Sequence, residues 1–511
     1  MANTNKPMSP VDAAWYHIDG PVNLAQVTGI LLTQTPLDFA RVKEIYSHRL
    51  RPFERFRQRV VESGFPIATP HWEDMHHFDI DQHVHHIALP APHDQAALMN
   101  LISDLASTPL DHAHPLWQVH VVDNVEGGGA LIMRFHHCIG DGTAMMALSQ
   151  ELFDETPDAP LDRTQPTAHH PEAGLLDRLL GTARHTVERT TRLAVSTVQS
   201  GLDSVQHPEG LLEKAGIAVG AAGMLVSELL KSSDPKSPLK GDFGLEKRVA
   251  WSEPVPLDQV KAIGAQFGAK INDVLVAGVT GALRTYLAKR GADVDHNTLR
   301  SMVPVDLRPR GQGLNLGNEF GLVILELAVN QANPLERLRI TKAHMDRLKR
   351  SPEALAILTL FNIFGRGPKL LEDIAVQLFG SKASLVLTNV AGPRQTLYIA
   401  GAPIDRMMFW VPHPGKELGM GISILSYNGV VSLAVISDAH LVPDPEAIAQ
   451  AFSAEFAKMV ELVQSPPAVA EKPAPAVRLR CTAQTKKGQP CKNWPVAGTH
   501  YCRVHQPKAS A

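Results

Sequence analysis

The feature that limits the folds open to this chain is a β-hairpin that runs directly into a sharp turn and a helix. Two apolar runs, WQVHVVD and ALIMRFHH, flank Asn124–Gly129, a glycine-rich segment typical of a turn between paired strands. The second strand is expected to end at His136 and His137, with the helix TAMMALSQELF after it. Gly140 and Gly142 allow the abrupt change of direction between them. Because a strand end presents side chains to a cleft, this turn is a candidate functional site.

The residues of the turn suit general-base chemistry on an alcohol. A histidine with a pKa near neutrality is an efficient acceptor of a hydroxyl proton in a transition state, and Asp141 follows His137 by four residues. The sequence contains no G-x-S-x-G motif, and Cys138 is expected on the opposite strand face from His137. We therefore expect direct attack by a bound alcohol without an acyl-enzyme. Because adjacent strand residues face opposite ways, only one of His136 and His137 can be the base.

Strand-like and helical patterns divide the chain into five parts. They are an N-terminal lobe, a linker and helical connector, a C-terminal lobe, a Pro- and Ala-rich tether and a terminal module, at residues 1–154, 155–246, 247–463, 464–477 and 478–511. Both lobes mix strands and helices, which predicts an α/β (α+β) fold, and the second is expected to end in a helix near Pro445–Val463. An apolar helical stripe at 174–231 has arginines beside it, so this helix either packs across the seam between lobes or lies on an anionic membrane.

Charge and apolar content limit the partners and the location of the protein. The 511 residues carry a net charge of −3, which argues against a uniformly basic nucleic-acid binder. No apolar stretch approaches the roughly 18 to 20 residues that span a bilayer, and the polar N-terminal residues lack the pattern of a signal peptide. Four cysteines are too few for a disulfide framework. We expect a cytoplasmic protein without a transmembrane helix, which can still lie on a membrane surface.

The terminal module carries the pattern of a metal site. Cys481, Cys491, Cys502 and His505 are spaced C-x9-C-x10-C-x2-H, and three thiolates with one imidazole complete the tetrahedral shell of a structural zinc ion. About 30 residues cannot bury enough core alone, so metal would supply the stability. The spacing is similar to that of small zinc knuckles in some plant DNA-binding regulators. Residues 478–511 hold seven basic residues and no acid, a charge that suits either nucleic acid or an anionic membrane. Because the rest of the chain is acidic, we do not expect nucleic acid as a partner, and docking to an anionic membrane is the alternative.

Beyond these local patterns, the sequence resembles a known family. HHCIGDG, which contains His136, His137, Asp141 and Gly142, matches the HHxxxDG signature of the coenzyme A-dependent acyltransferase superfamily. Within that superfamily the chain is most similar to the bacterial wax ester synthase/acyl-CoA:diacylglycerol acyltransferase family. The supporting motifs are MSPVDAAWYHID near the start, FDIDQHVHHIALPAP at 78–92, Pro115-Leu116-Trp117, Asn272-Asp273-Val274, VPVDLRPR at 303–310, LGNEFG at 316–321 and TNVAGPR at 388–394.

This resemblance implies a two-lobed, chloramphenicol acetyltransferase-like fold with a tunnel between the lobes. It implies that a long acyl chain moves there from acyl-CoA to diacylglycerol, giving triacylglycerol, or to a fatty alcohol, giving a wax ester. Such an enzyme is expected at a membrane or lipid-droplet surface. Two alternatives remain open: another member of the superfamily that acts on a carrier-protein thioester or a diol, and a catalytically silent lipid-binding protein.

The resemblance also implies roles for individual residues of the motif. His137, the second histidine, is expected to be the general base, and His136 is not. Asp141 is expected to be a structural acid turned away from the pocket and paired with Arg308 of VPVDLRPR.

Three further motifs have a functional and a simpler interpretation. The resemblance implies that Pro115-Leu116-Trp117 shapes the lipid site, although core packing explains it equally well. It implies that Asn272 and Asp273 support the site from the other lobe, although Asn272 could simply be the N-cap of a helix that stops at Gly291. His83 and its neighbours in DQHVHHI are expected on an exposed strand and not in a metal site.

Overall fold

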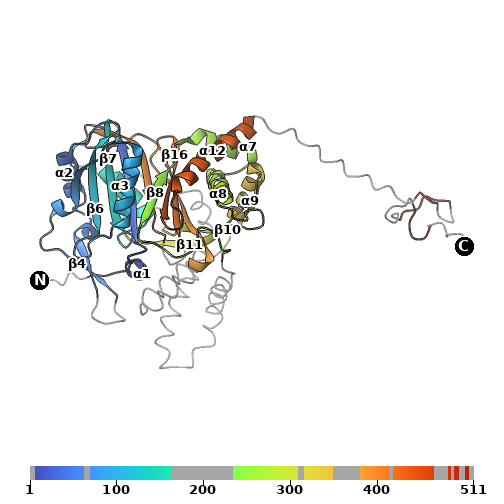
Figure 1. The fold of residues 1–511 in the computed structure, drawn as a ribbon, viewed down its shortest axis with the longest axis horizontal. Coiled ribbons are helices and arrows are strands. Elements are labelled where there is room, and N and C mark those ends of the chain that lie inside the picture. Colours follow the sequence, from blue (N-terminus) through green and yellow to red (C-terminus); the bar gives the residue numbers. More distant parts are fainter. Residues whose placement is uncertain are drawn as a thin grey trace, which may run out of the picture. The chain divides into compact units, whose positions relative to one another are not determined.

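The structure of the protein is a computed structural model, and it describes most of the chain (Figure 1). The described residues are 6–62, 69–162, 234–308, 316–348, 380–413, 418–464, 482–484, 488–493 and 501–505. They belong to two units, Met1–Val460 and Glu461–Ala511. The expected connector helix at 174–231 and the zinc-ligand candidate Cys481 lie outside the described residues.

The HHCIGDG motif lies at the end of a strand of a mixed sheet in the first unit. Within the described residues this sheet has six strands. In spatial order they are β13 (Tyr398–Ile399), β14 (Ala402–Trp410), β2 (Gln26–Thr33), β7 (Gly128–His136), β6 (Trp117–Val125) and β5 (Val84–Ala88). The β6–β7 hairpin is the one that the sequence predicts, and β7 ends at His136. Most residues of β7 are buried, and its sequence GGALIMRFH is apolar apart from Arg134 and His136.

Two strands of this sheet come from the C-terminal part of the chain. β14 pairs antiparallel with β2, with Thr28 opposite Trp410 and Leu31 opposite Met407. Residues 247–463 therefore contribute strands to both main sheets. In the first sheet they cover the edge that β2 would otherwise leave unpaired.

The second sheet holds the residues that approach the motif from the C-terminal half. Its strands are β11 (Phe320–Leu327), β10 (Leu299–Asp306), β12 (Leu385–Ala391), β15 (Met420–Tyr427), β16 (Val430–Asp438) and β8 (Lys247–Trp251), with β9 (Val255–Pro256) paired to β16. A small sheet contains β1 (Lys6–Pro7), β4 (His71–Asp74) and β3 (Gln58–Val61).

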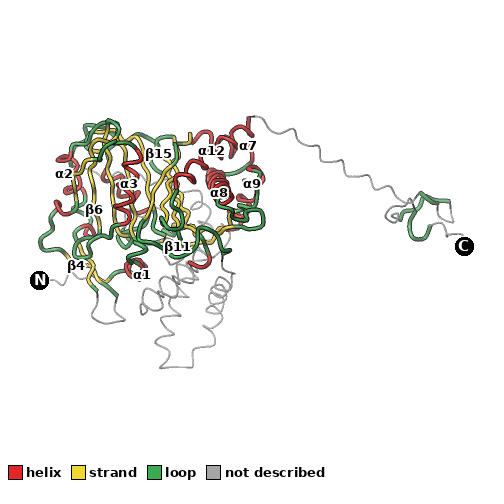
Figure 2. The backbone as a smooth tube through the Cα atoms, viewed as in Figure 1, coloured by secondary structure: helices red, strands yellow, loops and turns green. Residues whose placement is uncertain are grey.

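Helices flank these sheets (Figure 2). They are α1 (Pro10–Ile18), α2 (Phe39–Arg49), α3 (Gln95–Ser107), α4 (Gly142–Leu152), α7 (Leu257–Phe267), α8 (Ile271–Lys289), α9 (Pro334–Leu348) and α12 (Pro445–Gln464), with short 3-10 turns at Glu54–Phe56 and Ile80–Gln82. α7, α8, α9 and α12 gather beside the second sheet (Figure 2). The expected terminal helix of the second lobe is α12, and the helix after the hairpin is α4.

Helix α3 joins the two main sheets by hydrogen bonds to the edge strand β8. The backbone N–H groups of Val249 and Lys247 donate to the hydroxyls of Ser103 and Ser107, at 3.1 and 2.8 Å. One helical turn separates the two serines and two strand residues separate the two amides, so the spacings match. The edge of the second sheet is thereby satisfied by side chains of a helix from the N-terminal half.

Candidate active site

The HHCIGDG segment forms a tight turn between β7 and α4. Asp141 is the N-cap of α4, and its Oδ1 accepts a hydrogen bond from the backbone N–H of Ala144 at 3.0 Å. A Cβ atom at Gly140 would lie 2.7 Å from the Cε atom of Met145, so a larger residue there would require the end of the Met145 side chain to move. Local sequence thus sets the turn, as expected from its glycines.

His137 is a buried ring held from two elements that are distant in the sequence. Its Nδ1 lies 2.9 Å from Oδ1 of Asn318, which precedes β11. Trp15 of α1 stacks on the ring with 3.9 Å between centroids and 12° between planes. Burial lowers the pKa of His137, while the charge of Asp141 and the contact with Asn318 act in the opposite direction. The ring is therefore neutral near neutral pH and can accept a proton.

His136 has different surroundings. Its Nδ1 accepts a hydrogen bond from the backbone N–H of Cys138 at 3.1 Å, and its Nε2 lies 3.8 Å from Oδ2 of Asp19. Asp19 also contacts His112, at 3.2 Å. Burial lowers the pKa of His136 to about 4, even though the charge of Asp19 opposes the shift. The two adjacent histidines thus belong to separate polar networks.

Cys138 is not poised to act as a nucleophile. Its side chain is fully buried, and burial raises the pKa of the thiol well above its usual value. A thiol that stays protonated is a weak nucleophile.

Asp141 and Arg308 form the ion pair that the resemblance implies. Arg308 Nη2 lies 2.7 Å from Asp141 Oδ2, and Nη1 lies 2.8 Å from Oδ1, so the contact is bidentate. Arg308 also donates to the carbonyl of Gly317, and the N–H of Glu319 donates to Asp141 Oδ2 at 3.0 Å. Burial alone would lower the pKa of Arg308, but the charge and hydrogen bonds of Asp141 raise it above its usual value. These contacts attach the segment that carries Asn318 to the HHCIGDG turn.

The expected capping role of Asn272 is wrong. α8 begins at Ile271 with Lys270 as its N-cap, and Asp273 Oδ2 accepts the hydrogen bond from the Lys270 N–H at 2.9 Å. Asn272 lies in the first turn, where its Oδ1 accepts from Nδ2 of Asn389 in β12 at 2.7 Å. The helix starts earlier because the carboxylate at its third position caps it from inside.

β12 connects this helix start to the HHCIGDG turn. Val390 follows Asn389, and its Cγ2 atom would lie 3.9 Å from a Cβ placed on Gly142. Two consecutive residues of β12 thus lie near Asn272 and near Gly142.

Leu116 and Trp117 lie in the core of the first unit. Their side chains are buried, and Trp117 Nε1 donates to the Phe56 carbonyl at 2.9 Å. His83 is also buried, which corrects the expectation of an exposed strand: it precedes β5, stacks on Trp117 at 4.5 Å and contacts the Trp117 carbonyl through Nδ1 at 2.8 Å. The polar pattern of the segment does not indicate this burial, because it depends on packing against a tryptophan 34 residues further along the chain.

The sequence alone indicates no individual role for four residues that lie around His137. Asp12, Trp15 and Asn318 lie in the motifs MSPVDAAWYHID and LGNEFG, and Arg55 lies in neither. Their place in a motif indicates a role for the first three. The contacts of Trp15 and Asn318 with His137 form only where α1 and the segment before β11 meet at the turn.

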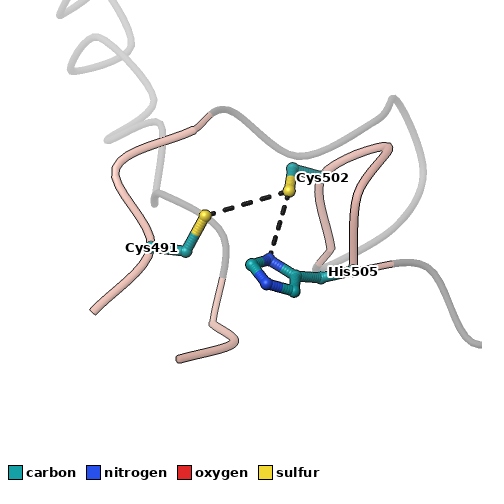
Figure 3. Close-up of side chains that lie close together, drawn as sticks. All are labelled: Cys491, Cys502 and His505. Carbon is teal, nitrogen blue, oxygen red and sulfur yellow. Dashed lines mark hydrogen bonds between the residues drawn. The ribbon is translucent and has the colours of Figure 1, made fainter. Parts of the chain in front are cut away.

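The terminal unit brings three of the four expected metal ligands together (Figure 3). Cys491 Sγ and Cys502 Sγ are 3.8 Å apart, and Cys502 Sγ is 3.3 Å from His505 Nδ1. Their ligand atoms all lie within 4.8 Å of one another. Two thiolates that each lie about 2.3 Å from a tetrahedral zinc ion are roughly 3.8 Å apart, so these separations suit zinc.

The part of the chain that the structure describes contains no helix with the length and apolar character needed to cross a bilayer.

Comparisons with known proteins place most of the chain in one family. Residues 8–275 match the wax ester synthase/diacylglycerol acyltransferase catalytic domain, and residues 316–460 match the WS/DGAT C-terminal domain. A putative diacylglycerol O-acyltransferase of Mycobacterium bovis is 31% identical over 426 residues, which covers 81% of this chain and 87% of that protein. A probable diacylglycerol O-acyltransferase of Mycobacterium tuberculosis has the same identity and coverage.

Solved structures share the fold. A wax ester synthase/diacylglycerol acyltransferase from Marinobacter aquaeolei VT8 is 21% identical and matches with a TM-score of 0.63, covering 90% of this chain and 100% of that one. The first condensation domain of the calcium-dependent antibiotic synthetase is 17% identical with a TM-score of 0.57, covering 92% and 98% of the two chains. The expected mixed α/β, acyltransferase-like fold is therefore confirmed.

Proposed function

Since this chain belongs to the wax ester synthase/diacylglycerol acyltransferase family and is therefore an O-acyltransferase that acts on lipids, we propose that it carries a long acyl group from acyl-CoA to the hydroxyl of diacylglycerol or of a fatty alcohol. The two substrates meet between the lobes, at the end of β7. The observation that carries this proposal is the neutral His137 ring, held by Asn318 and Trp15 at that strand end.

We propose that His137 is the general base. It takes the hydroxyl proton of the acceptor as the oxygen attacks the thioester carbonyl of acyl-CoA. The tetrahedral intermediate then collapses, the carbon–sulfur bond breaks, and the proton passes from His137 to the departing thiolate. The products are the ester and free coenzyme A, and His137 is neutral again. The buried, protonated Cys138 thiol supports this direct transfer over a route through an acyl-enzyme.

The other candidate residues support the base without exchanging a proton. Asp141 and Gly142 set the turn and the start of α4, and Arg308 attaches the turn to the second sheet. Asn272 and Asp273 stabilise the facing helix start. Because Leu116 and Trp117 are buried, we propose that Pro115-Leu116-Trp117 shapes the lipid site by packing behind its wall.

We propose that the terminal module binds one structural zinc ion. Cys481, Cys491, Cys502 and His505 would supply its four ligands, and the spacing of the last three side chains supports this. A closed shell leaves no position for substrate, so the acyltransferase lobes at 1–154 and 247–463 would work without the module.

The basic charge of this module supports a peripheral location. We propose that residues 478–511, joined by the tether 464–477, help the cytoplasmic enzyme to associate with an anionic membrane or a lipid-droplet surface. Flotation with anionic vesicles would then be weaker for a chain truncated at Ser465 and at high salt. Equal flotation of the two forms at low salt would reject this role.

The proposed reaction is tested with purified protein, labelled palmitoyl-CoA and a panel of acceptors. We expect labelled triacylglycerol or wax ester, and a loss of about 10²- to 10⁴-fold in turnover for His137→Ala. His296→Ala is the matched control, because this histidine is exposed and its Nδ1 lies 3.0 Å from Oδ1 of Asp293. Near-normal turnover of a folded His137→Ala variant would contradict the mechanism. Transfer to a carrier-protein thioester or a diol alone would contradict the acceptor.

A further inference from the structure

We infer that Asn318 is a positioning residue that fixes the tautomer of His137, and that Asp12 in turn fixes Asn318; this inference rests on the proposed role of His137 as the base. The three side chains form a relay in which an uncharged amide, and not a carboxylate, contacts the catalytic ring. Nothing in the mechanism above requires this choice of side chain.

The orientation of the Asn318 amide follows from its partners. Its Nδ2 lies 2.8 Å from Asp12 Oδ1 and 2.8 Å from the backbone carbonyl oxygen of His137. The carbonyl can only accept, and the Asp12 oxygen already accepts from the Asn318 backbone N–H at 3.0 Å. A flipped amide would place its oxygen against both acceptors, so Oδ1 must face the ring.

The tautomer of His137 follows from that orientation. Asn318 Oδ1 can only accept, so Nδ1 of His137 carries the hydrogen across the 2.9 Å contact. In the neutral ring the other nitrogen, Nε2, then holds the lone pair that receives the proton. Trp15 stacks on the ring and restricts its rotation out of this contact.

Asp12 links the relay back to the turn. Its side chain is fully buried, and Oδ2 accepts from Arg55 Nη2 at 2.9 Å. Arg55 Nη1 donates to the carbonyls of Cys138 and Ile139, at 3.1 and 2.9 Å. The residues that follow His137 are thus held by the same network that holds its ring.

The amide orients the ring without placing a charge on it. A carboxylate in direct contact with Nδ1 would favour the protonated ring, and a protonated ring cannot act as a base. Here the charge of Asp12 lies one side chain away and faces Arg55, while Asp141 faces Arg308. The remaining titratable neighbour, His136, is buried and its pKa is about 4, so it adds no charge near neutral pH.

Two variants test the relay through the pH dependence of turnover. Asn318→Leu removes the acceptor, and Asp12→Asn removes the distant charge. Both of these groups raise the pKa of His137, so the acid limb of the kcat/KM profile should move to lower pH in each variant. In Asn318→Leu we also expect kcat to fall about 5- to 150-fold, the cost of leaving the buried Nδ1–H of His137 without its acceptor, with KM unchanged.

A second measurement reports the tautomer without turnover. In protein labelled with ¹⁵N-histidine, the His137 resonances are assigned by their loss in His137→Gln. At pH 7.5 the wild type should show a single Nδ1–H tautomer, and Asn318→Leu a mixture of the two. If the leucine variant does not fold, Asn318→Ala removes the same groups without adding volume and is measured in its place.

Gln58→Leu is the matched control. Gln58 is also buried, and its amide donates to an aspartate, Asp74, at 2.8 Å. This variant should leave both the acid limb and the His137 tautomer unchanged. An unmoved acid limb and an unchanged tautomer in folded Asn318→Leu would overturn the relay. Normal turnover of His137→Ala would instead overturn the proposed base, and the tautomer measurement would still decide the relay.

Discussion

Removal of the Asp141 charge should destabilise the fold as well as the site. The Asp141–Arg308 pair is largely shielded, with 7% and 11% of the two side chains exposed. Breaking one partner of a buried, hydrogen-bonded pair typically costs about 3 to 5 kcal/mol, because the other charge stays buried without compensation. Asp141→Asn is the sharpest change, since asparagine is also a good N-cap and keeps an acceptor for the Ala144 N–H. Its effect therefore reports the ion pair and not the cap of α4.

A double-mutant cycle measures the coupling between the two side chains. Urea unfolding is followed for the wild type, Asp141→Asn, Arg308→Met and the double variant. We expect each single variant to lower the free energy of unfolding by about 3 kcal/mol or more, and the double variant to lose about 2 kcal/mol less than the sum. Asp258→Asn is the control, because the Asp258–Lys261 pair is mostly exposed and should contribute almost nothing. Additive effects of the two single variants would refute the coupling.

Other measurements test the base, the buried histidines and the metal site. His137→Ala should lose about 10²- to 10⁴-fold in turnover of labelled palmitoyl-CoA while His296→Ala keeps it, and equal losses would point to a general effect of histidine removal. Burial lowers the pKa of His120 to about 3, so below about pH 6.5 the unfolded chain binds a proton that the folded chain does not. The free energy of unfolding therefore decreases as the pH is lowered. His120→Leu should therefore flatten urea-unfolding stability between pH 6.5 and 4 by up to about 1.4 kcal/mol per pH unit, and an unchanged slope would contradict the neutral ring. Metal analysis should find about one zinc ion per full-length chain and none in Cys502→Ser, with turnover in detergent kept by the serine variant; retained zinc would exclude this cysteine as a ligand.

Local sequence was sufficient for the parts of the site that near neighbours build. The hairpin, the end of β7 at His136 and the helix α4 follow from apolar runs and glycines within about 35 residues. The resemblance to a family added the Asp141–Arg308 pair, which spans 167 positions. The spacing of Cys491, Cys502 and His505 likewise agrees with their proximity.

Sequence patterns predicted burial, helix starts and strand pairing least reliably where segments that are distant in the sequence pack together. The burial of His83 depends on stacking against Trp117, and the start of α8 depends on which of several polar residues caps it. β14 pairs with β2, about 370 residues earlier, because an open edge of the first sheet accepts it.

The HHCIGDG turn shows both contributions at one place. The sequence determined that a strand ends at a histidine pair and that glycines and Asp141 turn the chain into a helix, since these features depend on residues a few positions apart. Only the tertiary structure decided which side chain meets the ring of His137. Asn318 lies 181 positions away, and its contact exists because the second sheet delivers it to the turn. Periodicity encodes which face a residue occupies, whereas the partner on that face is fixed when separate elements pack together.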